Sequence, residues 1–378
     1  MKLYFDNAAT TLNKPPGVAE AVSNALMRMG NPGRSGHASA MLAADAVYRC
    51  RELASDLFDV LPERVIFTMN ATHALNIAIR SLVPYQGKVV ISGFEHNAVT
   101  RMLYALQADA LVANHRLFDT QDTIHCFDKA IRTDVDAVIV NHVSNVFGYV
   151  QPLEEIAAIC RDRGVPLIVD AAQSAGVLPI SLEKLQAAFI AMPGHKALFG
   201  PQGTGMLLCG VMPKPLLFGG TGNLSMQQSM PDMMPEGLEA GTLNVPGICG
   251  LAEGMKFVQS VGVDKISEHE RALSSYFCNQ MNRIEACRVF RGEKETQLGV
   301  VSADFLNCDC ENIAGFLAEM GVSVRSGLHC APLAHRSAGT EKSGTVRFSF
   351  SALNTEKEID SLMSLLERKK DDLSHGKL

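Results

Sequence analysis

The chain has 378 residues, of which 47% are hydrophobic and 20% are charged, so it is long enough for two domains and has an ordinary globular composition. The formal net charge of −6 gives no electrostatic indication of a nucleic acid or an anionic membrane as partner. The apolar stretch 187–210 is interrupted by Gly, Pro, His and Lys, which excludes a membrane-spanning helix there.

The amino terminus and the cysteines indicate a reducing compartment. No basic segment followed by an apolar core precedes Asp6, so we expect no secretory signal. The ten cysteines are scattered, and we expect reduced thiols in a cytoplasmic protein rather than a disulfide framework. Cys308 and Cys310 are closely spaced, but no second pair accompanies them; we therefore expect no metal site and interpret them as part of a strand end or loop.

Between about residues 60 and 210, short apolar runs alternate with helical patterns. The runs predict strands at 64–69, 88–92, 137–142, 165–170 and 188–191, and an antiparallel strand at 205–209. The helical patterns predict helices at 72–82, from about 97, and at 153–163. This alternation favours a mostly parallel sheet covered on both faces, in which ligands bind beyond the carboxyl ends of the strands.

The pattern changes after the loop 219–246. Helices are predicted at 250–261, 267–283, 311–320 and 355–368, and strands at 299–305 and 345–350. We predict a large domain at 14–255 and a smaller α+β domain formed by residues 1–13 and 256–378. The charged segment 368–378 is interpreted as a solvated end.

Asp170 and Lys196 together predict a cofactor. Asp170 closes the apolar run 165–169, and Lys196 ends the sequence Pro-Gly-His-Lys. Pyridoxal 5'-phosphate (PLP) needs a lysine amine for its aldehyde and an acid that keeps its ring nitrogen protonated. The alternatives are an aspartate that caps the next helix and a solvated lysine. The Gly/Pro-rich, nearly uncharged setting of Lys196 favours the cofactor.

Other polar residues also follow predicted strands. Thr72 and His73 would place backbone N–H groups at a helix amino end, where a phosphate can bind, although a plain N-cap is the simpler interpretation. His96 could lie flat on an aromatic cofactor, but a lone histidine is more often a surface or core residue. Asn145 could bind a ring hydroxyl or be an ordinary turn residue. Gln173 could reach the ring oxygen and His195 the phosphate.

Several motifs together resemble one family. They are Tyr-Phe-Asp-Asn-Ala-Ala-Thr-Thr at 4–11, Asn-Pro-Gly-Arg-Ser-Gly-His at 31–37, Val-Asp-Ala-Ala-Gln-Ser at 169–174, Gly-His-Lys at 194–196 and Val-Arg-Phe-Ser at 346–349. The chain resembles, over nearly its whole length, the cysteine desulfurase and selenocysteine lyase branch of the class V aminotransferases. These are fold type I PLP enzymes, so the resemblance implies an α/β fold with a mostly parallel seven-stranded sheet in the large domain.

The resemblance also implies a role for each matching residue. Lys196 would carry PLP, Asp170 would pair with the ring nitrogen, His96 would stack on the ring, Asn145 and Gln173 would address the ring hydroxyl, and Thr72, His73 and His195 would hold the phosphate. Arg347 would clamp the substrate carboxylate, with Asn7 and Ala8 nearby. A loop at 239–244 would cross the interface of a homodimer and bring Thr242 to the partner's phosphate.

Cys330 stands in the sequence Arg-Ser-Gly-Leu-His-Cys-Ala-Pro at 325–332. A cysteine flanked by an imidazole and a nearby arginine can have a lowered thiol pKa, whereas the other nine cysteines are expected to be small core residues. By the resemblance, Cys330 takes the sulfur of L-cysteine as a persulfide, L-alanine leaves, and the sulfur passes to an acceptor protein or a small thiol.

The chain also departs from the family pattern. Position 73 is His where many relatives are acidic, Leu328 replaces a second His, the glycine-rich segment 219–223 differs, and the segment from Cys330 to Arg347 is short. These changes keep selenocysteine lyase open, as well as a class V aminotransferase without desulfurase activity. A dinucleotide-dependent oxidoreductase would need Gly-x-Gly-x-x-Gly where the chain has Asn-Ala-Thr-His. A non-catalytic scaffold would not need both Asp170 and Lys196.

Overall fold

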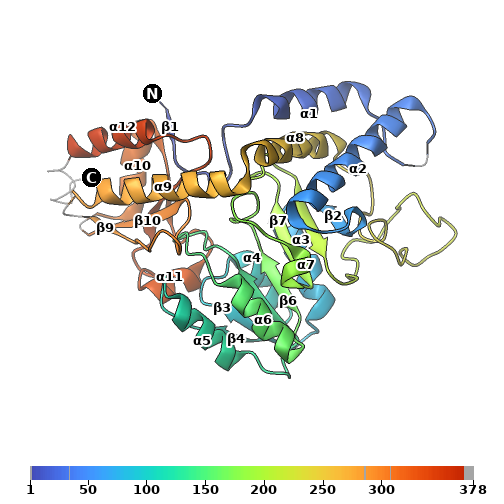
Figure 1. The fold of residues 1–378 in the computed structure, drawn as a ribbon, viewed down its shortest axis with the longest axis horizontal. Coiled ribbons are helices and arrows are strands. Elements are labelled where there is room, and N and C mark those ends of the chain that lie inside the picture. Colours follow the sequence, from blue (N-terminus) through green and yellow to red (C-terminus); the bar gives the residue numbers. More distant parts are fainter. Residues whose placement is uncertain (1, 34, 285–286, 307, 370–378) are drawn as a thin grey trace.

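The computed structural model describes residues 2–33, 35–284, 287–306 and 308–369, so most of the predicted solvated end lies outside the described residues (Figure 1). Two main sheets, each with its own helices, lie beside one another, and a third sheet of the described residues has only two strands. The long helices α8 (Val245–Val261) and α9 (Val263–Met281) follow each other along both parts. Within these residues, no helix has both the length and the apolar character needed to cross a membrane.

The larger sheet has seven strands within the described residues. In spatial order they are β2 (Val65–Thr68), β8 (Gly205–Cys209), β7 (Phe189–Pro193), β6 (Leu167–Asp170), β5 (Ala137–Asn141), β3 (Lys88–Ser92) and β4 (Asp109–Ala113). Strand β8 is antiparallel to both of its neighbours, and the other neighbouring pairs are parallel. The predicted mostly parallel sheet and its antiparallel strand at 205–209 are therefore confirmed.

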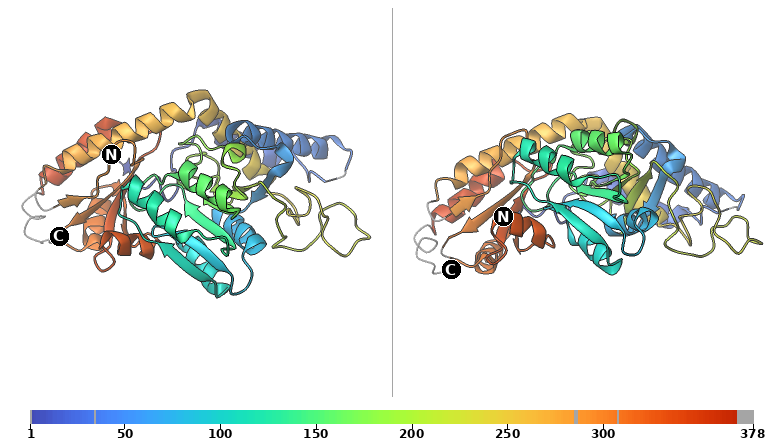
Figure 2. Two further views of the ribbon diagram at one scale, coloured as in Figure 1. Left: turned by 60° about the horizontal axis from the view of Figure 1, so that its bottom comes forward. Right: turned by 90° about the horizontal axis from the view of Figure 1, so that it is seen from below.

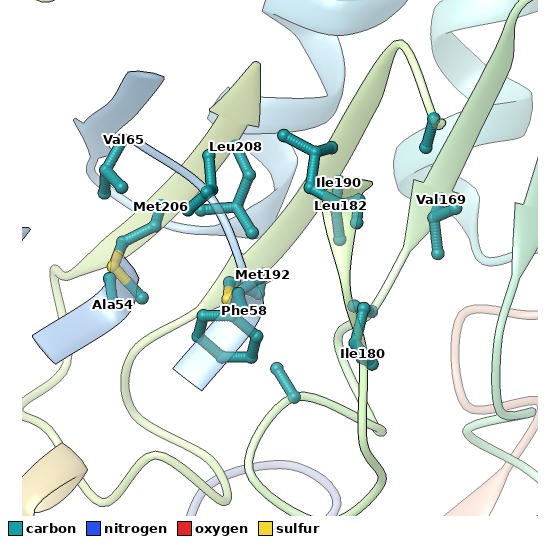
Figure 3. Close-up of a cluster of buried hydrophobic side chains, with 14 of the residues drawn as sticks. Ala54, Phe58, Val65, Val169, Ile180, Leu182, Ile190, Met192, Met206 and Leu208 are labelled. Atoms are coloured by element: carbon teal, nitrogen blue, oxygen red, sulfur yellow. The ribbon is translucent and has the colours of Figure 1, made fainter. Parts of the chain in front are cut away.

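Helices cover both faces of this sheet because successive strand residues point to opposite sides. In β6, Leu167 and Val169 face one hydrophobic cluster and Ile168 faces the other. The first cluster, part of which Figure 3 shows, is closed by α2 (Ala38–Phe58), α5 (Thr120–Ala130), α6 (Leu153–Arg163), α7 (Leu182–Leu185) and α8. The second is closed by α3 (Ala71–Leu82) and α4 (Asn97–Ala105). Helix α1 (Pro16–Arg28) packs on α8, and a short 3-10 helix, Pro62–Arg64, precedes β2.

The smaller sheet is antiparallel, in the order β12 (Arg325–Gly327), β13 (Thr345–Ser349), β10 (Val300–Phe305) and β9 (Cys287–Val289). Its hydrophobic cluster includes residues of α9, α10 (Cys310–Glu319) and α12 (Glu356–Glu367). Strand β1 (Leu3–Tyr4) pairs with β11 (Val322–Ser323), so the amino terminus lies with this part of the chain. Helix α11 (Pro332–Ala338) lies between β12 and β13 in the sequence. The predicted domain boundary at 255/256 falls within helix α8 and stays a prediction.

A long segment at 211–244 projects from the larger part beyond α2 (Figure 2). The part of this segment that leads back into α8 is held by a buried ion pair: Arg51 Nη2 lies 2.6 Å from Glu239 Oε2, and both side chains are at most 7% exposed. Glu239 Oε1 also accepts a hydrogen bond from the backbone N–H of Phe67, at 2.7 Å. Burial raises the pKa of Glu239, whereas the guanidinium of Arg51 acts to lower it and so stabilises the ionised carboxylate.

Arg51→Met should lower the free energy of unfolding by about 3–5 kcal/mol, because it leaves the buried Glu239 carboxylate without a counter-charge. The measurement is urea unfolding at neutral pH. Combining Arg51→Met with Glu239→Gln removes the uncompensated charge while keeping an acceptor for the Phe67 N–H, so the double variant should be more stable than the single one. A double variant that is less stable than Arg51→Met would contradict this account.

A second buried carboxyl group lies in α9. Glu270 is 5% exposed, has no hydrogen-bond partner among the described residues, and lies against Gly299. Burial raises the pKa of Glu270 to about 8. The folded protein therefore keeps a proton on this group at pH values where the unfolded chain, with an ordinary glutamate pKa of about 4.3, has released it.

Glu270→Gln should change how stability depends on pH. In the wild type, the raised pKa of Glu270 makes the free energy of unfolding fall as pH rises from about 4.3 to about 8, because the folded state binds the extra proton. Urea unfolding at pH 5 and pH 8 should show the variant gaining roughly 3 kcal/mol relative to the wild type between those pH values. An unchanged difference at both pH values would mean that Glu270 is ionised in the folded protein.

Candidate active site

A cavity of about 110 Å³ lies where the central strands of the larger sheet end. Because parallel strands end at the same edge, side chains that follow different strands meet there. Seven of the residues predicted from the sequence line this one cavity: Thr72, His96, Asn145, Asp170, Gln173, His195 and Lys196. A larger groove, of about 1120 Å³, lies on the opposite edge beside the first residues of β6, and none of the predicted site residues lines it.

Lys196 and Asp170 both line the cavity, and the charge of each acts on the pKa of the other. Lys196 follows β7 and is half-buried, and Gly194 before it has no room for a Cβ because Thr204 lies against it. Burial lowers the pKa of Lys196 to about 8, although Asp170 acts in the opposite direction. A large fraction of the amine is therefore neutral at slightly alkaline pH, as a nucleophile or a base requires.

Asp170 ends β6 and is 4% exposed. One carboxyl oxygen accepts a hydrogen bond from the backbone N–H of Ala172 at 2.9 Å, and the other has no partner among the described residues. Burial raises the pKa of Asp170, while Lys196 acts to lower it. The free oxygen lines the cavity, where a protonated ring nitrogen would supply the missing donor.

The two histidines of the cavity are neutral. His96 is the N-cap of α4, and its Nδ1 accepts the backbone N–H of Ala98 at 3.0 Å. His195 Nδ1 lies 3.1 Å from Thr10 Oγ1. Burial, helped by the charge of Lys196, lowers the pKa of each imidazole to about 4. A neutral imidazole can lie on an aromatic ring or donate one hydrogen bond to a phosphate, but it adds no positive charge.

The amino end of α3 offers fewer free donors than the sequence indicates. Asn70 is the N-cap, and its Oδ1 accepts the backbone N–H of His73 at 2.9 Å. The first N–H groups of the helix, at Ala71 and Thr72, have no acceptor within the helix and remain available for an anion. The His73 imidazole does not line the cavity; its Nδ1 accepts from the Met69 N–H, and its buried Nε2 has no partner.

Another lysine lies beside the cavity. Lys14 Nζ donates to the His195 carbonyl at 2.9 Å, and burial lowers its pKa to about 8 as well. Lys14 does not line the cavity, because its amine is turned toward the backbone of the loop. The depressed pKa alone therefore does not distinguish Lys196; its position beside Asp170 does.

The amino-terminal segment reaches the site from the smaller part of the molecule. Asn7 uses its amide to bind the Ser349 carbonyl and Asn354 Oδ1, at 2.9 and 3.0 Å. Gln173 Nε2 donates to the Ala8 carbonyl at 3.0 Å, so in this structure it is directed at the segment. Asn7, Ala8, Gln173 and Lys196 line a second, very small cavity next to the first one.

Arg347 lies on β13 and is 2% exposed. Its Nη2 pairs with Asp6 Oδ1 at 2.8 Å, its Nη1 donates to the Asn145 carbonyl at 2.9 Å, and its buried Nε has no partner. Asn145 also has an unpaired atom. Its Nδ2 donates to the His329 carbonyl at 2.8 Å, but its buried Oδ1 has no hydrogen-bond partner. An incoming carboxylate would satisfy the unpaired Arg347 donor.

Cys330 lies outside the lining of the cavity, on the loop between β12 and α11, and its side chain is exposed. The other nine cysteines are buried or half-buried. The Cys330 carbonyl accepts the backbone N–H of Asn97 at 2.7 Å, next to His96. Burial lowers the pKa of His329 to about 2, so this imidazole is neutral. A neutral ring adds no positive charge to the loop that carries the thiol.

Two acidic residues of the site have no role in the sequence analysis. Asp6 is the counter-charge of Arg347. Glu95 is fully buried behind His96; its Oε1 accepts from Ser92 Oγ at 2.6 Å and from the Asn141 N–H at 3.0 Å, and burial raises its pKa to about 8. Each stands beside a residue that the sequence does single out, which is the only local signal for them. Thr242 is exposed on its loop and does not line the cavity.

Comparisons with known proteins agree in one family. The family model described as "Aminotransferase class-V" matches residues 3–362. A probable cysteine desulfurase of Pyrococcus abyssi is 31% identical, over 97% of this chain and 93% of the relative. The apo structure of a cysteine desulfurase from Thermococcus onnurineus NA1 has a TM-score of 0.88 and 28% identity, covering 98% of this chain and 95% of the other.

A cysteine desulfurase of Escherichia coli, solved with an S-sulfonic acid, has a TM-score of 0.85 and 25% identity, with 98% and 95% of the two chains covered. The family match thus extends over both sheets and all of the residues that form the cavity. This chain belongs to the class-V aminotransferase family.

Proposed function

We propose that this protein is a PLP-dependent cysteine desulfurase, which converts L-cysteine to L-alanine and holds the released sulfur as a persulfide on Cys330. One observation carries the proposal. Asp170, with a free carboxyl oxygen, lies in one cavity with Lys196, whose pKa is lowered, and Asn145 at its edge holds the loop of the exposed Cys330. The relatives named as cysteine desulfurases support the same reaction.

The residues of the cavity fit PLP, on which the family depends. Asp170 would meet the ring nitrogen, Lys196 would bind the aldehyde, and the neutral His96 would lie on the ring, with Asn145 and Gln173 near the ring hydroxyl. The phosphate would lie against the α3 amino end at Thr72, with His195 as a further contact. The contact predicted for His73 would require its side chain to turn away from Met69, because its backbone N–H is already bound by Asn70. Bound PLP would supply an electron sink at the α-carbon of the substrate.

Three side chains of the protein, those of Arg347, Lys196 and Cys330, would each carry out one part of the reaction. Arg347 would use its unpaired Nε to orient the substrate carboxylate beside Asn7 and Ala8. The neutral amine of Lys196 would take the proton from the α-carbon of L-cysteine. The Cys330 thiolate would attack the substrate sulfur, so that an S–S bond forms and the C–S bond breaks. The electron pair of the C–S bond stays with the carbon skeleton. The β-carbon then takes up one proton, the α-carbon regains one from the protonated amine of Lys196, and L-alanine leaves.

We also propose that the protein acts as a homodimer and passes its sulfur to an acceptor protein or a small thiol. Large apolar side chains are exposed on α1 and on the projecting segment, among them Met27 at 72%, Phe218 at 76% and Met226 at 97%. Exposed apolar surface of this kind marks interaction sites. Thr242, on the same segment, would face the partner's phosphate.

Selenocysteine lyase is the second candidate. The residues between Cys330 and Arg347 are taken up by helix α11, a turn and the start of β13, and the Cys330 carbonyl is tied to Asn97. A loop tied in this way favours a dedicated acceptor, or a substrate whose selenium leaves readily, over broad sulfur delivery. Selenocysteine is therefore the competing substrate in the test of Cys330 below.

Lys196→Ala should remove the covalent attachment of PLP. After incubation with PLP and borohydride reduction, mass spectrometry should find the cofactor on the wild-type peptide that contains Lys196 and nowhere on the variant. Lys14→Met is the matched control, because Lys14 also has a pKa of about 8 and lies next to His195. Label that remains in Lys196→Ala, or that is lost in Lys14→Met, would contradict the role assigned to Lys196.

Cys330→Ala should lower alanine formation from L-cysteine by about 100-fold or more, because no thiol remains to accept the sulfur. The visible absorbance of bound PLP should be unchanged. Cys126→Ala, at a half-buried cysteine on α5, should keep wild-type activity. A selenocysteine lyase would give a different pattern, with wild-type turnover of selenocysteine far above that of cysteine and largely retained in Cys330→Ala. Full cysteine turnover in Cys330→Ala would disprove the proposed mechanism.

A further inference from the structure

The loop that carries Cys330 has an unfavourable backbone conformation. His329 and Cys330 both have positive φ angles, of 51° and 55°, in the left-handed region that residues with a Cβ rarely adopt. Two such residues in succession persist only where the surrounding structure holds them. The backbone is tied at three carbonyl groups: those of Leu328, His329 and Cys330 accept from Ala331 N–H, Asn145 Nδ2 and Asn97 N–H, respectively.

A series of hydrogen bonds between buried side chains, those of His329, His335 and Thr340, also supports this loop. His329 Nε2 lies 3.2 Å from the Arg325 carbonyl, and His329 Nδ1 lies 3.3 Å from His335 Nε2. His335 Nδ1 in turn lies 2.8 Å from Thr340 Oγ1. The two imidazoles are nearly parallel, at 12°, and His329, His335 and Thr340 are at most 5% exposed.

The direction of each hydrogen bond in the series from Thr340 to the Arg325 carbonyl follows from the Arg325 carbonyl at its end. The Arg325 carbonyl can only accept, so His329 Nε2 carries the hydrogen. Burial lowers the pKa of His329 to about 2 and that of His335 to about 4, so each ring has one N–H. His329 Nδ1 therefore accepts from His335 Nε2, and His335 Nδ1 must accept from the hydroxyl of Thr340.

We propose that Thr340 and His335 are positioning residues for Cys330: the Thr340 hydroxyl sets the tautomer of His335, His335 sets that of His329, and the fixed His329 ring holds the loop in the conformation that exposes the thiol. Neither residue touches the cavity, and each acts through the next. The importance for catalysis rests on the proposed function, whereas the effect on the loop does not.

Thr340→Val tests the series, because valine keeps the shape of threonine and removes only the hydroxyl donor. Without the Thr340 hydroxyl, two arrangements of His335 are possible. If the hydrogen stays on Nε2, Nδ1 has no donor; if it moves to Nδ1, the lone pair of Nε2 faces the lone pair of His329 Nδ1. One hydrogen bond is lost in both cases. Hydrogen–deuterium exchange should become about tenfold faster or more at the amides of Asn97 and Ala331, which close the loop. Thr340→Ser keeps the hydroxyl and should restore wild-type exchange.

Kinetics of the PLP-loaded enzyme give the second readout. Thr340→Val should lower kcat for L-cysteine by about tenfold and leave KM nearly unchanged, because the groups that would bind substrate are not altered. Thr123→Val is the matched control: Thr123 is also fully buried and bonds a histidine, His115 Nδ1, at 2.9 Å, but on helix α5. Thr123→Val should lower the free energy of unfolding by a similar amount. Hydrogen–deuterium exchange at Asn97 and Ala331 and kcat should stay as in the wild type.

Wild-type exchange in Thr340→Val overturns the proposal, whether or not kcat falls. An equal effect on exchange and kcat in Thr123→Val also overturns it. If Thr340→Val does not fold, the comparison moves to His335→Gln, which retains an N–H donor for His329, and His335→Leu, which does not; equal exchange in these two would overturn the proposal. The wild type could also show no desulfurase activity while hydrogen–deuterium exchange in Thr340→Val becomes faster as expected. The proposed function would then be wrong, but the role of Thr340 and His335 in holding the loop would remain supported.

Discussion

The buried ion pair between Asp6 and Arg347 joins the parts of this molecule that the site requires. The two residues are 341 positions apart, and the pair connects the amino-terminal segment with strand β13 of the smaller sheet. Arg347 extends the connection to the larger part through the Asn145 carbonyl. Because an unpaired buried guanidinium would cost several kcal/mol, the segment that carries Asn7 and Ala8 cannot leave without a large penalty. The position of the segment that lines the second, very small cavity is thus set by charge as well as by packing.

Exclusion of water gives the cavity its chemistry. The same burial lowers the pKa values of Lys196, His96 and His195 and raises that of Asp170. Charged forms are disfavoured throughout, so the protein presents an amine that releases its proton easily and imidazoles that act only through hydrogen bonds and their rings. The unpaired atoms of Asp170, Asn145 and Arg347 are then the places where a bound cofactor and substrate would restore polar contacts.

Much of the larger sheet can be predicted from the sequence because its central strands are buried on both faces and read as continuous apolar runs. Strand β4 has no prediction, although its residues 110–113 form a short apolar run. It lies at the edge of the sheet, where its first four residues alternate between exposed and half-buried and only Ala113 is buried. Helices α1, α2 and α5 also lack a prediction. Of the helices after residue 245, α10 and α12 agree closely with the prediction, α9 begins at Val263 rather than at 267, and α11 has no prediction. Helix α8 begins at Val245 rather than at 250, since Asn244 caps it and Pro246 stands in its first turn.

The site divides in the same way. Asp170, His96 and Lys196 follow strands directly, so their meeting at one edge can be derived from the order of the elements. Asp6 and Glu95 have partners that only the folded chain brings to them. The environment of His329 is an instructive case, because the sequence shows only that its imidazole neighbours Cys330. That the ring is buried against His335 and neutral is seen only in the folded chain.

The antiparallel strand β8 has a consequence for Lys196. Because β8 returns beside β7, the lysine lies in a closed hairpin connection whose two ends are fixed by the pairing of Pro193 with Gly205. Inside it, the Gly194 N–H binds the Thr204 carbonyl and the Gly200 N–H binds the Gly194 carbonyl, so the connection has little slack. An inserted or deleted residue between 194 and 204 would have to break one of these backbone contacts or move Lys196. The length of this connection therefore helps to fix where the amine lies relative to the sheet.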